Sequence, residues 1–357
     1  MRRLAVSLFA LLGVSLGALT AAPPAKRTPV DESIDQALLF LARTQEKDDG
    51  SWKAGRLGKN PAITALAVMA FLSAGHVPGE GPYGETVERG IRAVLKAQQA
   101  NGLIAAEGGH EMYHHGICTL MLAEAAGMTD GRLGADVRKA LEKAVAVVLK
   151  AQRTSGEDKG GWRYRVAPVD GSDISVTGWQ MMALRAAKNL GCDVPPDAVD
   201  RAVEYVKRCQ DHSSGGFRYT PRGGSGGVTI PCTGTSILCL EICGKEHHHS
   251  DEALKAGAFL LKNLPRWGSP HFFYGIYYCS QATFQLGDNY WNYFRPHLHE
   301  TLLANQKENG SWVGGDFDAQ TYGPNYCTAM AVLALTVEYR YLPIYQRGEE
   351  PADAPKK

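Results

Sequence analysis

Apolar residues along the chain recur with a helical period in two alternating kinds of segment. The first kind ends at a glutamine and carries charged residues on one side, as in ALLFLARTQ and AVEYVKRCQ. The second kind follows a glycine-rich turn and a loop, and it is almost free of charge all round, as in AITALAVMAFLSAG and CTGTSILCLEICG. A helix with one charged side faces water on that side, whereas an uncharged helix is buried on every side. The pattern therefore predicts outer and inner helices in alternation.

The turns that follow the glutamines form an internal repeat with a spacing of about 55 residues, and such regular spacing is typical of repeat architectures. They read QEKDDGSW, QQANGLI, QRTSGEDKGGW, QDHSSGGF and QKENGSW, and they begin at Gln45, Gln98, Gln152, Gln210 and Gln306. The longer last interval contains a degenerate copy near Leu264 and Trp267. The repeat therefore predicts six helical hairpins, which make one domain over residues 30–347.

Six such hairpins can bury every uncharged helix and keep the charged faces in water if they close into two concentric rings. We therefore expect an all-α fold, an (α/α)6 toroid; an open solenoid is the alternative, but it would need polar capping repeats that we do not find. The turn itself needs no catalytic role, because a glutamine amide can pair with carbonyl groups, a glycine can adopt the left-handed conformation and an aromatic ring can cover the turn. We interpret its aromatic residues as structural: Trp52, Trp162, Phe217 and Trp312.

The first 22 residues have the features of a signal peptide. Arg2 and Arg3 precede an apolar run over residues 4–19, and small residues follow up to Ala22. The run is shorter than the ~20 residues that a membrane span needs, which argues against the alternative of a membrane anchor. We expect export to the periplasm or the extracellular space, a linker over 23–29, no transmembrane segment in the mature chain and a disordered polar tail over 348–357.

The charge balance narrows the function classes. The 357 residues include 38 basic and 37 acidic side chains, so the net charge of +1 argues against a nucleic-acid partner held by a basic field. Most of the eight cysteines lie inside apolar runs, where we expect buried thiols. Cys192 and Cys209 flank one predicted helix and are the one pair that we consider for a disulfide.

The tryptophan turns and several longer segments resemble a known superfamily. The segments are MYHHGI, GGWRY, DISVTGWQMMAL, YYCSQ and EYRYLPIYQ. The GSW and GGW turns resemble the QW motifs of squalene and hopene cyclases and of protein prenyltransferase β-subunits. A closer resemblance is to exported proteins with prenyltransferase/squalene oxidase repeats, common in planctomycete-like bacteria. The likeness spans residues 30–346 and implies a toroid with a central apolar pocket for an isoprenoid or another lipid, which opens at the N-terminal ends of the inner helices.

The chain departs from the reaction motifs of that superfamily. It has no DxDD, whose middle aspartate protonates the substrate of the cyclases, and no DDxxD for a magnesium diphosphate. The Asp-x-Cys part of the prenyltransferase zinc site is also missing, since Asn325 stands two residues before Cys327. The sequence therefore leaves open whether the protein is an enzyme.

Candidate site residues cluster where the inner helices are expected to begin. We select Glu111, His115 and Asp173 as candidate catalytic residues, although Asp173 is equally suited to capping a helix. Aromatic side chains with few charges suit an apolar ligand, and their faces can stabilise a carbocation. The candidate ligand-binding residues are Tyr113, Tyr274, Tyr277, Tyr278, Tyr326 and Cys327.

A zinc motif competes with this interpretation. Residues 110–114 read HExxH, which on a helix places two imidazoles on one face for zinc and supplies a glutamate as general base. Gly108 and Gly109 precede the motif, so we expect the helix to begin near Met112. Zinc stays an open cofactor candidate, with His110 and His114 as ligands. We expect the second histidine cluster, residues 247–249, to lie in a solvated loop.

Four functions remain open at this point. The first is an isoprenoid-binding or isoprenoid-transforming toroid, and the second is a non-catalytic scaffold that binds a ligand or a protein partner. The third is a polysaccharide-active toroid, which uses paired carboxylates and aromatic platforms; Glu111, Asp173, Asp316 and Asp318 could supply the carboxylates. The fourth is a zinc hydrolase that uses His110 and His114.

Overall fold

The computed structural model describes residues 27–167, 171–244 and 247–346. The predicted signal peptide, most of the predicted linker and the predicted polar tail lie outside the described residues. Helix α1 already begins at Pro29, where Thr28 and Asp31 form a capping box, so the last residue of the predicted linker is helical. No helix in the described part of the chain is long and apolar enough to cross a membrane.

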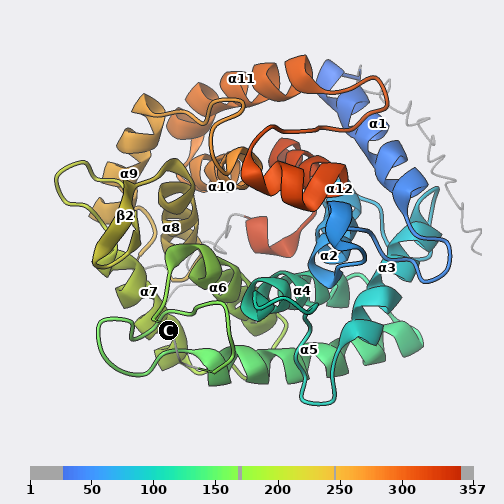
Figure 1. The fold of residues 1–357 in the computed structure, drawn as a ribbon, viewed down its shortest axis with the longest axis horizontal. Coiled ribbons are helices and arrows are strands. Elements are labelled where there is room, and N and C mark those ends of the chain that lie inside the picture. The colour runs from blue at the N-terminus through green and yellow to red at the C-terminus, as the bar shows by residue number, and fades with distance from the viewer. Residues whose placement is uncertain (1–26, 168–170, 245–246, 347–357) are drawn as a thin grey trace, which may run out of the picture.

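The described residues form twelve α-helices, which alternate between an outer and an inner layer (Figure 1). The outer helices are α1 (Pro29–Thr44), α3 (Gly84–Ala97), α5 (Gly131–Ala151), α7 (Pro196–Arg208), α9 (Asp251–Lys262) and α11 (Asp288–Asn305). The inner helices are α2 (Pro61–Ser73), α4 (Glu111–Ala126), α6 (Ile174–Asn189), α8 (Ile230–Ile242), α10 (Phe272–Gln285) and α12 (Phe317–Leu335). In α2, α4, α6 and α8 nearly every residue is buried, as their small number of charged residues predicts.

The inner helices form a closed ring. Each packs against the next along the chain, and α12 packs against α2, while α1 lies beside α11 in the outer layer (Figure 1). The fold is therefore an (α/α)6 toroid, and the alternative of an open solenoid is wrong.

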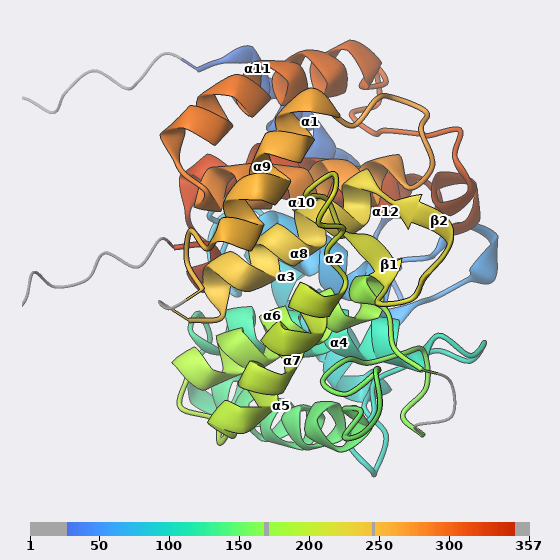
Figure 2. The same cartoon turned by 90° about the vertical axis from the view of Figure 1, so that its left-hand side faces the viewer.

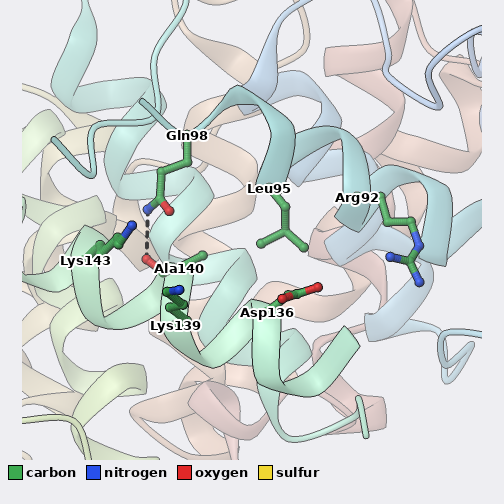
Figure 3. A pocket seen from close by; sticks show the side chains of 7 residues that line it. All are labelled: Arg92, Leu95, Gln98, Asp136, Lys139, Ala140 and Lys143. Carbon is green, nitrogen blue, oxygen red and sulfur yellow. Dashed lines mark hydrogen bonds between the residues drawn. The ribbon is translucent and has the colours of Figure 1, made fainter. Parts of the chain in front are cut away.

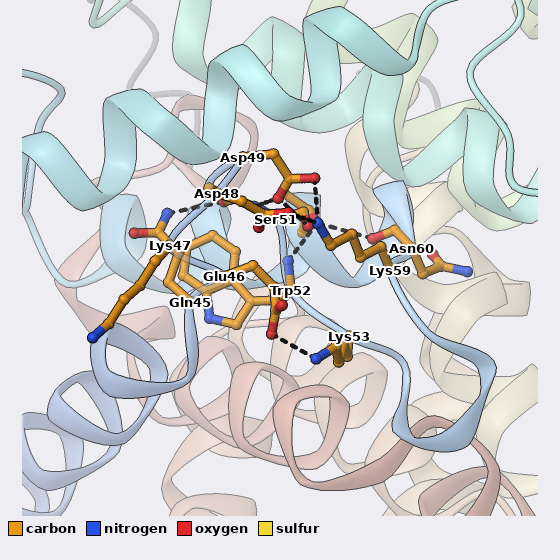
Figure 4. A network of polar contacts seen from close by, with 12 residues as sticks. Gln45, Glu46, Lys47, Asp48, Asp49, Ser51, Trp52, Lys53, Lys59 and Asn60 are labelled. Carbon is orange, nitrogen blue, oxygen red and sulfur yellow. Dashed lines mark hydrogen bonds and ion pairs between the residues drawn. The ribbon is translucent and has the colours of Figure 1, made fainter.

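The repeated glutamine connects each hairpin to the next. The amide of Gln45 donates hydrogen bonds to the carbonyl of Gly50 in its own turn and to that of Thr86 in α3, both at 2.9 Å. Figure 4 shows Gln45 with the residues of its turn, where Lys59 pairs with Asp49 at 2.9 Å. Gln98, Gln152 and Gln210 make the equivalent pairs of bonds to α5, α7 and α9. Gln306 donates to the carbonyl of Ser33 in α1 at 2.8 Å, so the last hairpin is bonded to the first.

The aromatic residue of each turn is also held by hydrogen bonds. The indole nitrogens of Trp52, Trp162 and Trp312 each donate to a carbonyl of the preceding outer helix at 2.8 Å. The backbone nitrogen of the same residue donates to a threonine hydroxyl on the following inner helix, and Phe217 makes this bond too. The contacts of the turn are thus structural, as we interpreted them.

The fifth copy of the turn is degenerate, as its sequence indicates. Asn263 replaces the glutamine, and its amide bonds only to Phe259 of the same helix. The link to the next outer helix comes instead from His297 of α11, whose Nε2 lies 2.7 Å from the carbonyl oxygen of Pro265. Trp267 packs edge-on against Phe272 and Phe273.

Two local features differ from the prediction. A small antiparallel hairpin, β1 (Arg218–Thr220) and β2 (Gly223–Val228), precedes α8 (Figure 2); Thr220 pairs with Gly223, whose φ of +89° suits a glycine at the turn. All eight cysteines are free thiols, so the disulfide that we considered between Cys192 and Cys209 does not form.

The chain fills part of the ring with its own C-terminal segment. After α12, the short 3-10 helices η2 (Val337–Tyr339) and η3 (Pro343–Tyr345) turn back into the middle of the ring (Figure 1). The hydroxyl of Tyr345 bonds to that of Tyr277, and Tyr277 stacks on Trp179 at a centroid distance of 5.6 Å. Near the C-terminal ends of the inner helices, the ring interior is therefore occupied by packed side chains.

Candidate functional site

Asp173 is a buried carboxyl group at the N-terminal end of α6. Asp173 has no exposed surface. Its Oδ1 accepts hydrogen bonds from the backbone nitrogen of Val176 at 2.9 Å and from the hydroxyl of Ser175 at 2.6 Å. Its Oδ2 lies 3.5 Å from a guanidinium nitrogen of Arg163. Asp173 therefore caps the helix with one oxygen and holds the other beside Arg163.

Burial raises the pKa of Asp173 above its usual value, because a charged carboxylate loses its hydration inside the protein. The hydrogen bonds from Ser175 and Val176, the attraction of Arg163 and a hydrogen bond from Tyr219 oppose this effect without cancelling it. The carboxyl group therefore holds a proton to a higher pH than an exposed aspartate does.

Four half-buried tyrosines lie near this carboxyl group or its partner Arg163: Tyr113, Tyr164, Tyr219 and Tyr274. Tyr164 and Tyr219 lie on either side of Arg163, whose guanidinium carbon is 4.7 and 5.5 Å from the two ring centroids. The two hydroxyls bond to each other. Tyr113 of α4 stacks on Tyr164 with a centroid distance of 5.9 Å, which extends the aromatic surface toward the next inner helix.

Ser175 connects the carboxyl group to two other inner helices. Its hydroxyl bonds to that of Tyr113 on α4, and its carbonyl accepts from the hydroxyl of Tyr274 on α10 at 3.0 Å. The ring of Tyr274 lies 4.6 Å from that of Tyr278. We call Tyr113, Arg163, Tyr164, Asp173, Ser175, Tyr219 and Tyr274 the tyrosine cluster.

Two further predicted ligand-binding residues, Tyr277 and Tyr278, lie on α10 about one turn after Tyr274. Tyr278 is fully buried, and its hydroxyl makes no hydrogen bond. Its ring contacts the edges of Trp179 and Tyr277 at 5.4 and 4.8 Å. Tyr277 belongs to the packed interior around Tyr345, so of the two only Tyr278 offers an unpaired polar atom.

The other predicted residues lie on α4 and α12. Tyr326 and Cys327 lie on α12, where Tyr326 is near Phe273 and Cys327 has no exposed surface. Burial raises the pKa of the Cys327 thiol to about 12, so it stays protonated. The Oε2 atom of Glu111 accepts a long hydrogen bond of 3.4 Å from the backbone nitrogen of Val166.

His115 has a structural place in the repeat. Its Nδ1 accepts from the backbone of Ile104 at 3.1 Å, where the other turns use a threonine hydroxyl, and its Nε2 lies 2.9 Å from the carbonyl of Ala144. Burial lowers its pKa to about 4, so the imidazole is neutral near neutral pH. Both ring nitrogens are occupied by backbone groups.

The two HExxH histidines lie at the start of α4 and have different neighbours. Helix α4 begins at Glu111, so His110 lies outside it at the N-cap, as we expected from the glycines. His114 contacts the amide of Asn60 at 3.2 Å and accepts from the backbone of Ala106. The one three-residue metal-ligand group that we find among the described residues is Glu241 with His248 and His249.

The outer ring carries a shallow groove between α3 and α5 (Figure 3). Its volume is about 330 Å³, and its lining residues are Arg92, Leu95, Gln98, Asp136, Lys139, Ala140 and Lys143. None of the predicted site residues lines it. The groove mixes charges of both signs on a solvent-facing surface, which is not the apolar site that the resemblance implies.

Sequence reasoning missed Arg163, Tyr164, Ser175 and Tyr219. A signal for three of them exists, because Trp162-Arg163-Tyr164 and Phe217-Arg218-Tyr219 occupy equivalent positions after two turns of the repeat. An aromatic-Arg-Tyr triplet that occurs twice at the repeat spacing predicts two neighbouring loops with similar geometry.

No family model matches the sequence, and no match is found among curated proteins. Solved structures do match. One is the α-1,6-mannanase GH76A of Salegentibacter sp. HEL1_6, solved as an inactive variant with α-1,6-mannotriose. Its TM-score is 0.65, its sequence identity is 12%, and the match covers 86% of this chain and 98% of that chain. The type II terpene cyclase MstE from Scytonema has a TM-score of 0.57 and 18% identity over 88% of this chain and 99% of that chain. At these identities the likeness establishes the toroid fold alone.

Proposed function

We propose that the chain is a terpenoid-cyclase-like toroid that binds an isoprenoid or another apolar molecule at the tyrosine cluster, with Asp173 as a carboxylic acid directed at the ligand. One observation carries this proposal. A carboxyl group without exposed surface lies beside Arg163 within the cluster of four tyrosines. A buried carboxyl group whose pKa is raised and whose neighbours are aromatic suits an apolar ligand better than a charged one.

The chemistry that fits this arrangement is protonation of a carbon–carbon double bond. The Asp173 proton forms a C–H bond with one alkene carbon, and the π electrons of the double bond supply the pair, so the neighbouring carbon becomes a cation. The aromatic faces stabilise that cation. The resulting carboxylate is held by Ser175, Val176 and Arg163. Loss of a proton from the product cation, or capture of water, restores the acid.

The fold neighbours support the proposal in part. A variant of the terpene cyclase MstE is solved with geranylgeranyl dihydroxybenzoate, its substrate, so a ring of this kind can hold an isoprenoid chain. Tyr278 gives this chain a further unpaired hydroxyl below the cluster. Membership of the exported prenyltransferase/squalene oxidase repeat proteins is part of the same proposal, since the quoted sequence segments resemble that group.

The test compares binding and turnover in matched variants. Purified mature chain is titrated with geranylgeraniol and with squalene while tryptophan fluorescence is followed, because Trp179 lies 6.5 Å from the ring of Tyr274. Products are analysed by mass spectrometry. Asp173→Asn keeps an oxygen for the helix cap but has no acidic proton, so we expect binding to persist and turnover to fall by about 100-fold or more.

Asp316→Asn is the matched control, because Asp316 caps α12 in the same way without being part of the tyrosine cluster. It should leave both binding and turnover unchanged. Absence of isoprenoid binding by the wild-type chain would refute the proposal. Equal turnover by wild type and Asp173→Asn would refute the acid role alone.

A polysaccharide ligand is the second candidate, and the mannanase neighbours favour it. Half-buried tyrosines can serve as platforms for sugar rings. A glycosidase needs two carboxyl groups about 5–9.5 Å apart across the bond that it cleaves, whereas the charged partner of Asp173 is Arg163. Titration with α-1,6-mannotriose in the same assay separates the two candidates. Binding of neither ligand would favour a scaffold that holds a protein partner.

We further propose that the protein acts outside the cytoplasm. The support is the N-terminal sequence alone, with Arg2 and Arg3 ahead of the apolar run over residues 4–19. Fractionation of cells that express the full chain tests this proposal. A mature protein that begins near Pro23 in the exported fraction is the expected result, and an uncleaved chain in the cytoplasm would contradict it.

A further inference from the structure

A buried glutamate faces two histidines at the opposite end of the inner ring from the tyrosine cluster. Glu241 lies in the last turn of α8, and His248 and His249 lie in the turn that leads to α9. The side chain of Glu241 has no exposed surface, whereas about half of each histidine side chain is exposed. The histidines lie in a half-exposed turn, in line with the expected solvated loop, and their rings also face this carboxylate.

The glutamate has one satisfied and one unsatisfied oxygen. Oε1 accepts a hydrogen bond from the backbone nitrogen of His249 at 2.9 Å. Oε2 makes no hydrogen bond, although the Nε2 atoms of His248 and His249 lie 3.2 and 3.6 Å away. A buried carboxylate oxygen without a donor is costly, so its surroundings call for an explanation.

The three ligand atoms have the spacing of a metal site. Oε2 and the two Nε2 atoms all lie within 4.8 Å of one another. A zinc ion at its usual bond lengths in tetrahedral geometry separates its ligand atoms by about 3.3 Å. The two measured distances from Oε2 bracket that value, so an ion could be bound with small rotations of the imidazoles.

The backbone and the local charge support the same interpretation. His249 has a φ of +54°, a conformation that is uncommon for residues other than glycine and that gathers at functional sites. The side chain of Glu241 is fully buried, where a negative charge is costly unless a positive charge lies beside it. A divalent cation would supply the missing positive charge.

We propose that Glu241, His248 and His249 form a binding site for a divalent transition-metal ion, with zinc as the ion that fits best. Two imidazoles and one carboxylate suit zinc, whereas calcium and magnesium prefer oxygen ligands throughout. The exposed side of the histidines leaves a fourth position for water. The ion would fasten the end of α8 to the turn before α9. This inference does not rest on the proposed isoprenoid function.

The experiment uses the purified mature chain after treatment with a chelator. Isothermal titration with zinc should give one site with a dissociation constant in the micromolar range or below, and zinc should raise the melting temperature. Cobalt(II) is the spectroscopic probe, because tetrahedral coordination gives it an intense visible absorption. Glu241→Gln keeps the shape of the side chain and an acceptor for His249 but removes the negative charge.

We expect Glu241→Gln and the double variant His248→Ala/His249→Ala to weaken zinc binding at least tenfold and to lose the cobalt spectrum, with unchanged circular dichroism. His110→Ala/His114→Ala is the matched control, and it should bind zinc like the wild type. Absence of zinc binding by the wild type would overturn the proposal in favour of a metal-free ion pair. Loss of binding in the control pair alone would move the site to the HExxH motif.

Discussion

Closure of the ring depends on a glycine that no other residue can replace without strain. Gly310 of the last turn has a φ of +88°, and a β-carbon there would lie 2.1 Å from the carbonyl oxygen of Gln36 in α1. Gln306 bonds to Ser33 of the same helix and to Gly310 itself, at 2.8 and 2.9 Å. Gly310→Ala should therefore separate the last hairpin from the first.

The expected loss of stability has three parts. The left-handed conformation costs an alanine about 1 kcal/mol relative to glycine. The overlap with the carbonyl of Gln36 needs a displacement of roughly 1 Å in a close-packed interface, which costs about 1–3 kcal/mol. That displacement also breaks the bond between Gln306 and Ser33, worth about 1 kcal/mol. Together they predict a loss of about 3–5 kcal/mol.

Gly191→Ala is the matched control. Gly191 has a φ of +81° after α6, and no atom lies within 4 Å of the β-carbon position, so only the conformational cost of about 1 kcal/mol applies. Urea unfolding followed by far-UV circular dichroism measures both variants. Equal unfolding midpoints for Gly310→Ala and Gly191→Ala would refute the reasoning, because the contact with α1 would then contribute nothing.

Two further predictions concern the packed interior of the ring. Burial raises the pKa of Glu124 to about 8, so the native state keeps a proton that the unfolded chain loses, and the free energy of unfolding should fall by about 1.4 kcal/mol per pH unit between about 4.5 and 8. Urea unfolding at several pH values should give a slope shallower by that amount in Glu124→Gln; an unchanged slope would mean that Glu124 ionises freely. Tyr345→Ala removes a buried ring that contacts Tyr277 and should cost about 3–5 kcal/mol, whereas Tyr341→Ala, at a half-exposed ring, should cost little. Thermal unfolding compares Tyr345→Ala with Tyr341→Ala. A similar melting temperature for both variants would contradict the idea that the C-terminal segment stabilises the ring by filling its interior.

The candidate site was only partly readable from the sequence. Asp173 is identifiable because it directly precedes an uncharged helix, a position where an aspartate is an N-cap or an acid. Whether Asp173 can also act as an acid depends on how deeply its carboxyl group is buried. Its surroundings include Tyr113, Tyr164 and Tyr219, which belong to separate hairpins. His115 shows the reverse case, since its sequence context suggested chemistry while its neighbours give it the place of a threonine in the repeat.

Local patterns were sufficient to predict the six helical hairpins and their two layers. The alternation of charged and uncharged helices determined which helices are outer and which are inner, and the glycine turns determined where each hairpin bends, because both depend on residues close together in the chain. Only the tertiary structure decided that Gln306 meets Ser33, that the C-terminal segment enters the ring and that Glu241 faces two histidines. Such contacts join residues whose proximity depends on how all six hairpins close, and no local periodicity encodes that closure.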